Sequence, residues 1–220
     1  MTQTILDITI SLDGFVAGPS PTLDDPLGQN GMLLHEWVFG LASWRSQHRL
    51  EGGAQDDDDA LVERGLANLG ADVMGRKMFS GGSGPWERDP NAGGWWGDDP
   101  PFRVPVFVVT HHPRETIEFP NGTSFTFVTD GVEAAVEQAR AAAAGRDVRV
   151  SGGASVATQA LRAGLLDRLD LHIAPLLLGG GTRLFEGADL TLFEPAETHA
   201  SPKVTHVSYR LASPRQQGDG

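Results

Sequence analysis

The sequence predicts an α/β domain in three layers, with a mostly parallel sheet between helices and an antiparallel hairpin at its C-terminal edge. Three observations support this prediction. Strand-type and helix-type segments alternate through the middle of the chain, and two strand-type segments end it. Residues 104–110 are largely apolar, as in a strand covered on both faces. We find neither an internal repeat nor a linker, so we expect residues 1–220 to form a single domain.

In the first part of the chain, a β-branched run predicts the first strand, and the turn signal Asp13-Gly14 follows it in a loop. A mixed apolar pattern and then a clearer amphipathic pattern predict two helices, the second ending near Gly70. The expected elements are a strand at residues 3–10, a loop at 11–21, helices at 30–48 and 58–69, and a strand at 71–75.

Residues 79–101 are rich in glycine, proline and tryptophan. This segment is longer than a compact domain normally uses for a connection, so we expect it to be functional or to form contacts. Beyond it, strands and helices alternate again. The expected elements are strands at residues 104–110, 124–129, 147–151 and 168–174, helices at 132–144 and 154–163, and a closing hairpin of residues 191–200 and 203–211.

Composition excludes several functions. The chain has no cysteine, which rules out disulfides, thiolate metal sites and thiol nucleophiles. The N-terminus has no signal-peptide pattern and no apolar run reaches the roughly 20 residues of a membrane span, so we expect a cytoplasmic protein without a membrane partner. The net charge of −12 argues against nucleic acid as a partner, and any phosphate must bind at a local cluster of positive groups.

Metal and hydrolase sites are not expected. The acidic run at residues 56–59 is interpreted as a solvated helix start, and His111-His112 lacks an acidic partner at helical spacing. No HExxH motif occurs, and His172 and His206 are interpreted as ordinary strand residues. Ser155 lacks the GxSxG turn of a hydrolase nucleophile.

Three strands end in glycine-rich or polar residues. In an open α/β sheet, ligands bind beyond the carboxyl ends of the strands, and a helix start after glycine presents free N–H groups to an anion. These exits are Gly75-Arg76-Lys77, Thr110-His111-His112 and Ser151-Gly152-Gly153-Ala154-Ser155. A glycine pair after a strand is more often a plain turn, and a basic pair at a helix start is more often solvated, but together the three exits indicate an extended ligand that carries phosphate.

Five stretches in order resemble a known family, the reductase domain of the bifunctional riboflavin-biosynthesis deaminase-reductase, a branch of the dihydrofolate-reductase-like fold. They are SLDGFVA from Ser11, VMGRKMF from Val73, PVFVVTH from Pro105, VSGGA from Val150 and PLLLGGGTRLF from Pro175. The resemblance spans residues 4–209. It implies a dihydrofolate-reductase-like α/β/α domain that binds NADPH across the carboxyl edge of the sheet, usually as a homodimer.

The same resemblance assigns cofactor contacts. It places Gly75, Arg76 and Lys77 at the phosphates and the adenosine end, and Thr110 and His111, with Arg114, near the ribose 2′-phosphate. The residues implied around the pyrophosphate are Ser151, Gly152, Gly153, Ala154 and Ser155. Val16 and Ala17 are implied to lie beside the nicotinamide. The chain departs from dihydrofolate reductases at Met78, where a threonine is common, and Val156-Ala157 supplies no aromatic side chain after the double glycine. The zinc deaminase domain is absent, because there is no cysteine.

The resulting hypothesis is an NADPH-dependent reductase of a small heteroaromatic substrate, pterin- or pyrimidine-like. Asp13 is the candidate polar residue near the reacting ring, although Asp-Gly is first a turn signature. Trp86, Trp95 and Trp96 fit either a stacking wall for the substrate or a dimer interface. The alternatives are a true dihydrofolate reductase and a non-catalytic protein that binds NADP.

Overall fold

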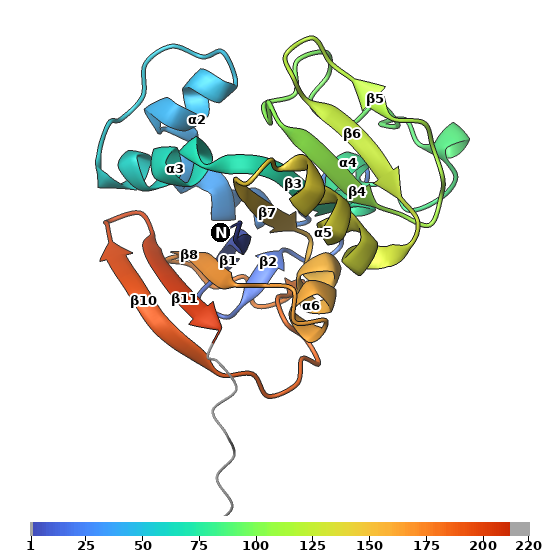
Figure 1. Ribbon diagram of the computed structural model, residues 1–220. Helices are drawn as coiled ribbons and strands as arrows, with labels where there is room; N and C mark the ends of the chain where they lie inside the picture. Colours follow the sequence, from blue (N-terminus) through green and yellow to red (C-terminus); the bar gives the residue numbers. More distant parts are fainter. Residues whose placement is uncertain (1, 212–220) are drawn as a thin grey trace, which may run out of the picture.

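Residues 2–211 are described in a computed structural model, whose centre is a nine-stranded sheet in the order β10-β11-β8-β1-β7-β3-β4-β6-β5 (Figure 1). Its strands are β1 (Thr4–Ser11), β3 (Leu69–Gly75), β4 (Pro105–Val109), β5 (Ile117–Glu118), β6 (Ser124–Val128), β7 (Asp147–Gly152), β8 (Arg168–Ala174), β10 (Phe193–Ala200) and β11 (Thr205–Leu211). The strands from β8 through β6 run parallel, whereas β10, β11 and β5 are antiparallel to their neighbours.

One face of the sheet is covered by α5 (Gly131–Ala142) and α6 (Ala154–Arg162). Side chains that alternate along the strands, such as Leu6, Val73 and Val150, meet small helix residues such as Ala135 and Ala157 in the main core cluster. Because alanine has no side chain beyond Cβ, the helices can lie close to the strands. Asp7, which follows Leu6 on β1, and Asp72, which precedes Val73 on β3, therefore lie on the opposite face.

The opposite face is covered in two parts. Over β3, β4 and β6 lie α4 (Arg76–Ser80) and the long loop with η2 (Trp86–Arg88), whose aromatic side chains pack around Phe79 and Phe125. Over β1, β8 and β11 lie η1 (Gly31–His35), α1 (Glu36–Phe39), α2 (Ala42–Gln47) and α3 (Asp57–Ala67). There the Trp37 Nε1–H donates to Thr9 Oγ1 over 3.3 Å. The predicted three-layer α/β/α fold with a mostly parallel sheet is confirmed.

Three expectations for the first part of the chain are wrong in detail. The acidic run at residues 56–59 does begin a helix, with Asp56 as its N-cap, but Asp58 and Asp59 are buried rather than solvated. Residues 30–48 are not one helix, because Gly40 ends α1 and Leu41 is extended, with φ −80° and ψ 144°, before α2 begins. The expected loop at residues 11–21 contains the short strand β2 (Phe15–Ala17), which pairs with β9 (Thr182–Arg183) in a second small sheet. Strands as short as β2, β5 and β9 carry no periodic signal in the sequence.

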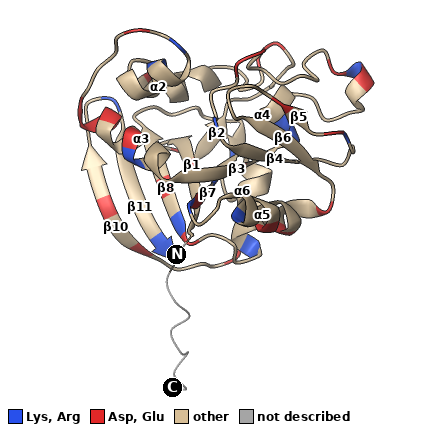
Figure 2. Cartoon of the chain, turned by 45° about the horizontal axis from the view of Figure 1, so that its top comes forward, with Lys and Arg blue, Asp and Glu red and all other residues tan. Residues whose placement is uncertain are grey.

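The closing hairpin is confirmed. β10 and β11 pair in register from Phe193↔Leu211 to Ala200↔Thr205, with a register shift after Pro195, and β11 joins the hairpin to β8. Within residues 2–211, no helix has the length and apolar character needed to cross a membrane. Figure 2 shows basic and acidic residues interspersed among the elements.

Candidate functional site

The carboxyl ends of β7, β3 and β4 lie side by side. Met74 is in register with Gly152, and Gly75 with Val109, so the three exits selected from the sequence lie at one edge of the sheet. A Cβ on Gly75 would come within 3.1 Å of Val156 Cγ2 and 3.6 Å of the Gly153 backbone nitrogen. Glycine at position 75 therefore lets the end of β3 touch the beginning of α6.

The N-terminus of α6 is open at this junction. Gly153 is its N-cap, no side chain caps the helix, and a Cβ on Gly153 would meet no heavy atom within 4 Å. The Gly152–Gly153 peptide is cis. The first N–H groups of an α-helix lack partners within the helix, and the helix dipole favours negative charge there. Ala154 is buried, while the exposed Ser155 accepts a hydrogen bond from Gln159 Nε2 over 3.0 Å.

Ser151 faces away from this helix start. Its hydroxyl donates to Asp72 Oδ1 over 2.6 Å, on the face of the sheet opposite α5 and α6. Asp72 is fully buried and also accepts from Arg149 Nε over 2.8 Å. Burial alone would lower the pKa of Arg149, but the carboxylates of Asp72 and Asp7 outweigh it and raise that pKa. Of the predicted pyrophosphate contacts, Gly153 has open space at its Cβ position and Ser155 is exposed, whereas Gly152 and Ala154 are buried.

Arg76 is buried at the start of α4. Its Nη2 forms an ion pair with Asp89 Oδ2 over 2.5 Å, and its guanidinium lies 3.5 Å from the centroid of the Trp86 ring. Burial and the nearby Arg114 lower its pKa against the opposing effect of Asp89. Its Nε and Nη1 atoms are buried and have no hydrogen-bond partner within the described part of the chain. The buried Nε and Nη1 atoms of Arg76 thus have hydrogen-bonding capacity that the described residues leave unused, whereas the side chain of Lys77 is exposed and makes no hydrogen bond or ion pair within residues 2–211.

The exit from β4 is held by local hydrogen bonds. The buried Thr110 donates its N–H to Val128 O over 3.0 Å and accepts the His112 N–H at Oγ1 over 3.1 Å, while His111 is exposed. The Arg114 guanidinium lies 4.9 Å from the Trp86 ring centroid, so one indole lies near two cations. The positive groups expected near a phosphate therefore gather around the ends of β3 and β4.

Asp13 links two loops at the end of β1. Its carboxylate accepts hydrogen bonds from Ser11 Oγ over 2.6 Å, Leu178 N over 3.1 Å and Gly179 N over 2.8 Å. The Ser11 hydroxyl and these backbone N–H groups lower the pKa of Asp13 to about 2. An ionised carboxylate with these donors carries no proton to transfer near neutral pH. In this structure Asp13 positions the loop after β8 beside Val16 and Ala17 of β2, whose contact with nicotinamide stays a prediction.

The three tryptophans of the long loop pack against the protein itself. Trp86 and Trp96 join the aromatic cluster of Phe79 and Phe125, with Trp96 stacked 5.9 Å from Phe125. Trp95 lies over Gly81, where a Cβ would come within 2.5 Å of its ring. These contacts anchor the loop, and any contact with substrate or a second subunit stays a prediction.

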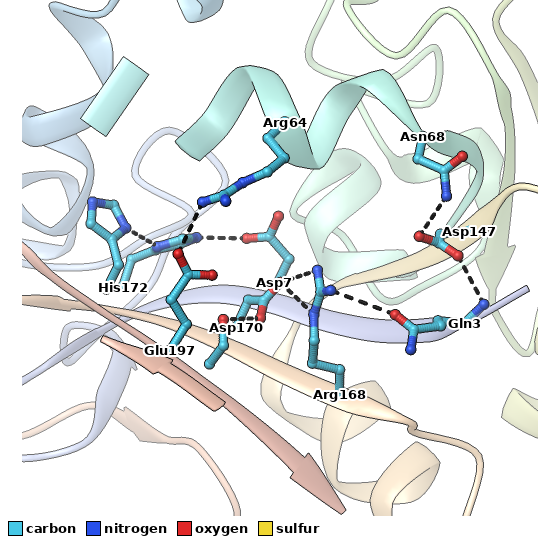
Figure 3. A network of polar contacts seen from close by, with 11 residues as sticks. Gln3, Asp7, Arg64, Asn68, Asp147, Arg168, Asp170, His172 and Glu197 are labelled. Carbon is cyan, nitrogen blue, oxygen red and sulfur yellow. Dashed lines mark hydrogen bonds and ion pairs between the residues drawn. The ribbon is translucent and has the colours of Figure 1, made fainter. Parts of the chain in front are cut away.

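Sequence reasoning missed a polar network on the face opposite α5 and α6 (Figure 3). His172 and His206, interpreted as ordinary strand residues, approach each other with 2.6 Å between their Nδ1 atoms. His172 Nε2 also lies 2.9 Å from Asp7 Oδ1. Strand alternation would have found this network, because Asp7, His172 and His206 all lie on the same face of adjacent strands. Within residues 2–211, no group of three or more histidines and acidic residues is arranged to hold a metal ion.

The strand order, the helix pair on one face and the glycine-lined edge at β7 and β3 agree with the dihydrofolate-reductase-like fold that the sequence predicts. Residues 2–207 match the RibD C-terminal domain family, and the chain belongs to that family, a family of reductases. No curated protein matches the sequence.

Solved structures agree in fold. A Shewanella sp. PV-4 protein described as a riboflavin biosynthesis protein is 20% identical, with TM-score 0.62, over 96% of this chain and 100% of its own. The Thermotoga maritima diaminohydroxyphosphoribosylaminopyrimidine deaminase/5-amino-6-(5-phosphoribosylamino)uracil reductase is 16% identical, with TM-score 0.55, over 96% of this chain and 57% of its own. Acinetobacter baumannii RibD is 15% identical, with TM-score 0.56, over 96% of this chain and 58% of its own. The chain thus spans little more than half the length of the latter two proteins.

Proposed function

We propose that this protein is an NADPH-dependent reductase of a small heteroaromatic substrate, pterin- or pyrimidine-like. The observation that carries the proposal is the junction of β3, β7 and α6, where Gly75 lets β3 approach the start of α6 and Gly153 leaves open space beside this uncapped helix start. Pyrophosphate groups bind in such places through backbone N–H groups and the helix dipole. We also expect the protein to act as a homodimer.

The residues around this junction fit a dinucleotide. The buried Nε and Nη1 atoms of Arg76 lack a partner among the described residues, and a phosphate oxygen is a strong acceptor for their N–H groups. Lys77 and His111 are exposed at the ends of the same strands. A bound NADPH would supply the hydride, and the chain's own residues would hold the cofactor and exclude water. The net charge of −12 makes such a local cluster necessary for an anionic cofactor.

The substrate class rests on the relatives. One of them is named as a reductase of 5-amino-6-(5-phosphoribosylamino)uracil, a pyrimidine that carries an amino group. Identity to that protein is only 16%, so we propose a pyrimidine as the substrate class and leave the substituents of its ring open. A true dihydrofolate reductase and a non-catalytic NADP-binding protein remain the alternatives.

Thermal unfolding with NADPH tests the cofactor site. A ligand that binds only the folded state raises the melting temperature, and at 1,000 times Kd the gain is about 4 kcal/mol. Absorbance at 340 nm then follows NADPH consumption with 5-amino-6-(5-phosphoribosylamino)uracil and, separately, with dihydrofolate.

The outcomes separate the three functions. NADPH consumption with the pyrimidine alone would support the proposal, and consumption with dihydrofolate alone would favour the dihydrofolate reductase. A thermal shift without turnover on either compound would favour the non-catalytic protein. No shift at millimolar NADPH would refute all three.

A further inference from the structure

Four side chains from four elements form one continuous hydrogen-bonded chain across the sheet. Asp58 Oδ1 of α3 lies 3.2 Å from His206 Nε2 of β11, whose Nδ1 lies 2.6 Å from His172 Nδ1 of β8. His172 Nε2 lies 2.9 Å from Asp7 Oδ1 of β1. The connection from His172 to Asp7 is visible in Figure 3. None of these residues belongs to the predicted cofactor contacts.

The number of protons in this chain follows from its geometry. Each of the three contacts needs one hydrogen between its two heavy atoms, so the chain holds three. Two neutral imidazoles carry only two ring protons between them. With Asp58 and Asp7 ionised, the histidine pair therefore carries three ring protons and one positive charge. A second charge is disfavoured, because two N–H groups would then face each other across the 2.6 Å contact.

The middle of the chain is shielded from water. The side chains of His206 and Asp58 are 7% and 2% exposed, and the Trp37 ring packs 4.9 Å from His172 and 5.0 Å from His206 between ring centroids. Burial and the neighbouring His172 lower the pKa of His206, which agrees with a single charge on the pair. Burial raises the pKa of Asp7, but the hydrogen bond and charge of His172, with Arg149 and Arg168, lower it overall.

The Asp7 end of the chain opens to solvent. The Asp7 side chain is 33% exposed, more than twice the 15% of His172, although it lies in the middle of a central strand. Asp7 lies on β1, which leads directly into β2 and the predicted nicotinamide contacts, and β1 is adjacent to β7. The charged and titratable groups that face the chain are His35 of η1, His199 of β10, Asp72 of β3, Arg149 of β7, and Arg168 and Asp170 of β8.

The geometry points to a proton store: we infer that the Asp58–His206–His172–Asp7 chain supplies the proton for reduction of a substrate bound against β1. This inference rests on the proposed reductase function. Hydride addition to a C=N or C=O bond brings both electrons to carbon, and the nitrogen or oxygen then needs one proton. His172 passes its Nε2 proton to Asp7, which gives it to the substrate, and the shared proton moves onto His172 Nδ1. Both rings are then neutral, and water restores the missing proton.

In this arrangement Asp58 is a positioning residue. Its carboxylate keeps a proton on His206 Nε2, so the proton shared between the Nδ1 atoms is the one free to move toward Asp7. Removing the charge of Asp58 while keeping its shape should make the pair lose its extra proton at lower pH. Asp58→Asn makes that change, and His206→Gln removes the second ring altogether.

Nitrogen-15 NMR of labelled histidines in the full chain tests the store without any substrate. At neutral pH we expect three ring protons on His172 and His206 together, one of them strongly deshielded between the two Nδ1 atoms. In Asp58→Asn the pair should lose that proton at lower pH, and in His206→Gln the deshielded signal should disappear. His48→Gln is the matched control, because His48 stacks on Trp44 and takes no part in the hydrogen-bonded chain. In that variant the signals of His172 and His206 should be unchanged.

Activity and cofactor binding complete the test. All three variants should keep the thermal shift with NADPH, since none of these residues lies in the proposed cofactor contacts. With the compound whose addition leads to NADPH consumption, Asp58→Asn should move the alkaline limb of the kcat/KM profile to lower pH. At a pH above that limb, kcat/KM should fall about 10-fold for each pH unit by which the limb moves. Two ring protons in the wild-type pair, or an unmoved limb in Asp58→Asn, would overturn the proton store and leave the reductase intact. No shift of the wild type with NADPH would overturn both.

Discussion

Gly153 stands where the chain leaves β7 and begins α6. Its Cβ position is open space, and its φ of −74° is one that other residues adopt. Gly153→Val should therefore keep the fold and abolish NADPH binding, because the branched side chain would occupy the space over the helix start. Fluorescence titration with NADPH, together with circular dichroism, measures both effects. In Gly84→Val, a matched change at another glycine with open space around it, binding should persist; retained affinity in Gly153→Val would refute the placement of the pyrophosphate.

Two buried histidines should make stability depend on pH. Burial lowers the pKa of both His35 and His206 below the ordinary histidine value of about 6.5, with the charge of His172 adding to the effect. Below about pH 6.5 the unfolded state then binds more protons than the folded state, so the free energy of unfolding falls as the pH falls. Denaturant titrations from pH 7 to pH 5 should show this loss.

His35→Gln separates the contribution of one histidine. The variant should show a shallower loss of stability between pH 7 and pH 5 than the wild type. His48→Gln serves as the control, since the His48 side chain makes local contacts, in which its Nδ1–H donates to the Trp44 carbonyl oxygen over 2.8 Å and its ring stacks on Trp44. An identical slope in His35→Gln and the wild type would contradict the assignment.

At the scale of single residues, the sequence predicted which positions lie at the strand exits but not where their side chains point. Arg76 follows Gly75 at the end of β3, as expected, yet one of its nitrogens is committed to Asp89, thirteen residues along the chain. Ser151 is likewise turned to Asp72. Both partners are distant in sequence, and no local pattern encodes such a pairing.

Among the elements, the long loop at residues 79–101 is fastened to α4 by Asp89. The Asp89 carboxylate accepts from Arg76, from Ser80 Oγ over 2.7 Å and from Asn91 N over 2.9 Å, and it is only 3% exposed. Asp89→Ala would leave the Arg76 guanidinium buried without its counter-ion. Loss of one partner of a buried ion pair costs about 3 kcal/mol or more.

Chemical denaturation measures this effect as a lower free energy of unfolding in Asp89→Ala. Asp98→Ala is the control in the same loop, because Asp98 is exposed and should change stability by less than about 0.5 kcal/mol. Equal stability of the two variants would show that Asp89 does not hold the loop.

Long periodic elements were predictable and short irregular ones were not. The helices α3, α5 and α6 and the strands of the central sheet follow from their hydrophobic patterns. The segment at residues 30–48 carries apolar residues at mixed spacing, and it folds as three short pieces because its Trp37 and Leu41 fill a separate cluster with Val204 of the closing hairpin. Tertiary packing overrode local preference there.

At the scale of the whole molecule, the proposed cofactor site joins three central strands, so NADPH should stabilise the sheet cooperatively. Backbone amides of β3, β4 and β7 that exchange by global unfolding should gain protection equivalent to about 4 kcal/mol at 1,000 times Kd. The edge strand β10 is largely exposed and should gain less, because it opens locally. Hydrogen exchange with mass spectrometry compares the protection of the central strands with that of β10. A gain of protection confined to the loops and the edge strand would contradict the proposed site.

By itself, the amino-acid sequence determined the α/β class, the order of the main elements, the membership implied by five ordered motifs, and the strand exits at Gly75, Thr110 and Gly152. Those features are local, since they depend on periodicity, turn residues and the conformations that glycine permits. Only the tertiary structure decided that Arg76 pairs with Asp89, that Asp13 joins two loops, and that Asp58, His206, His172 and Asp7 form one chain. Such contacts join residues far apart in sequence, and the sheet order that brings them together arises only when the whole domain packs.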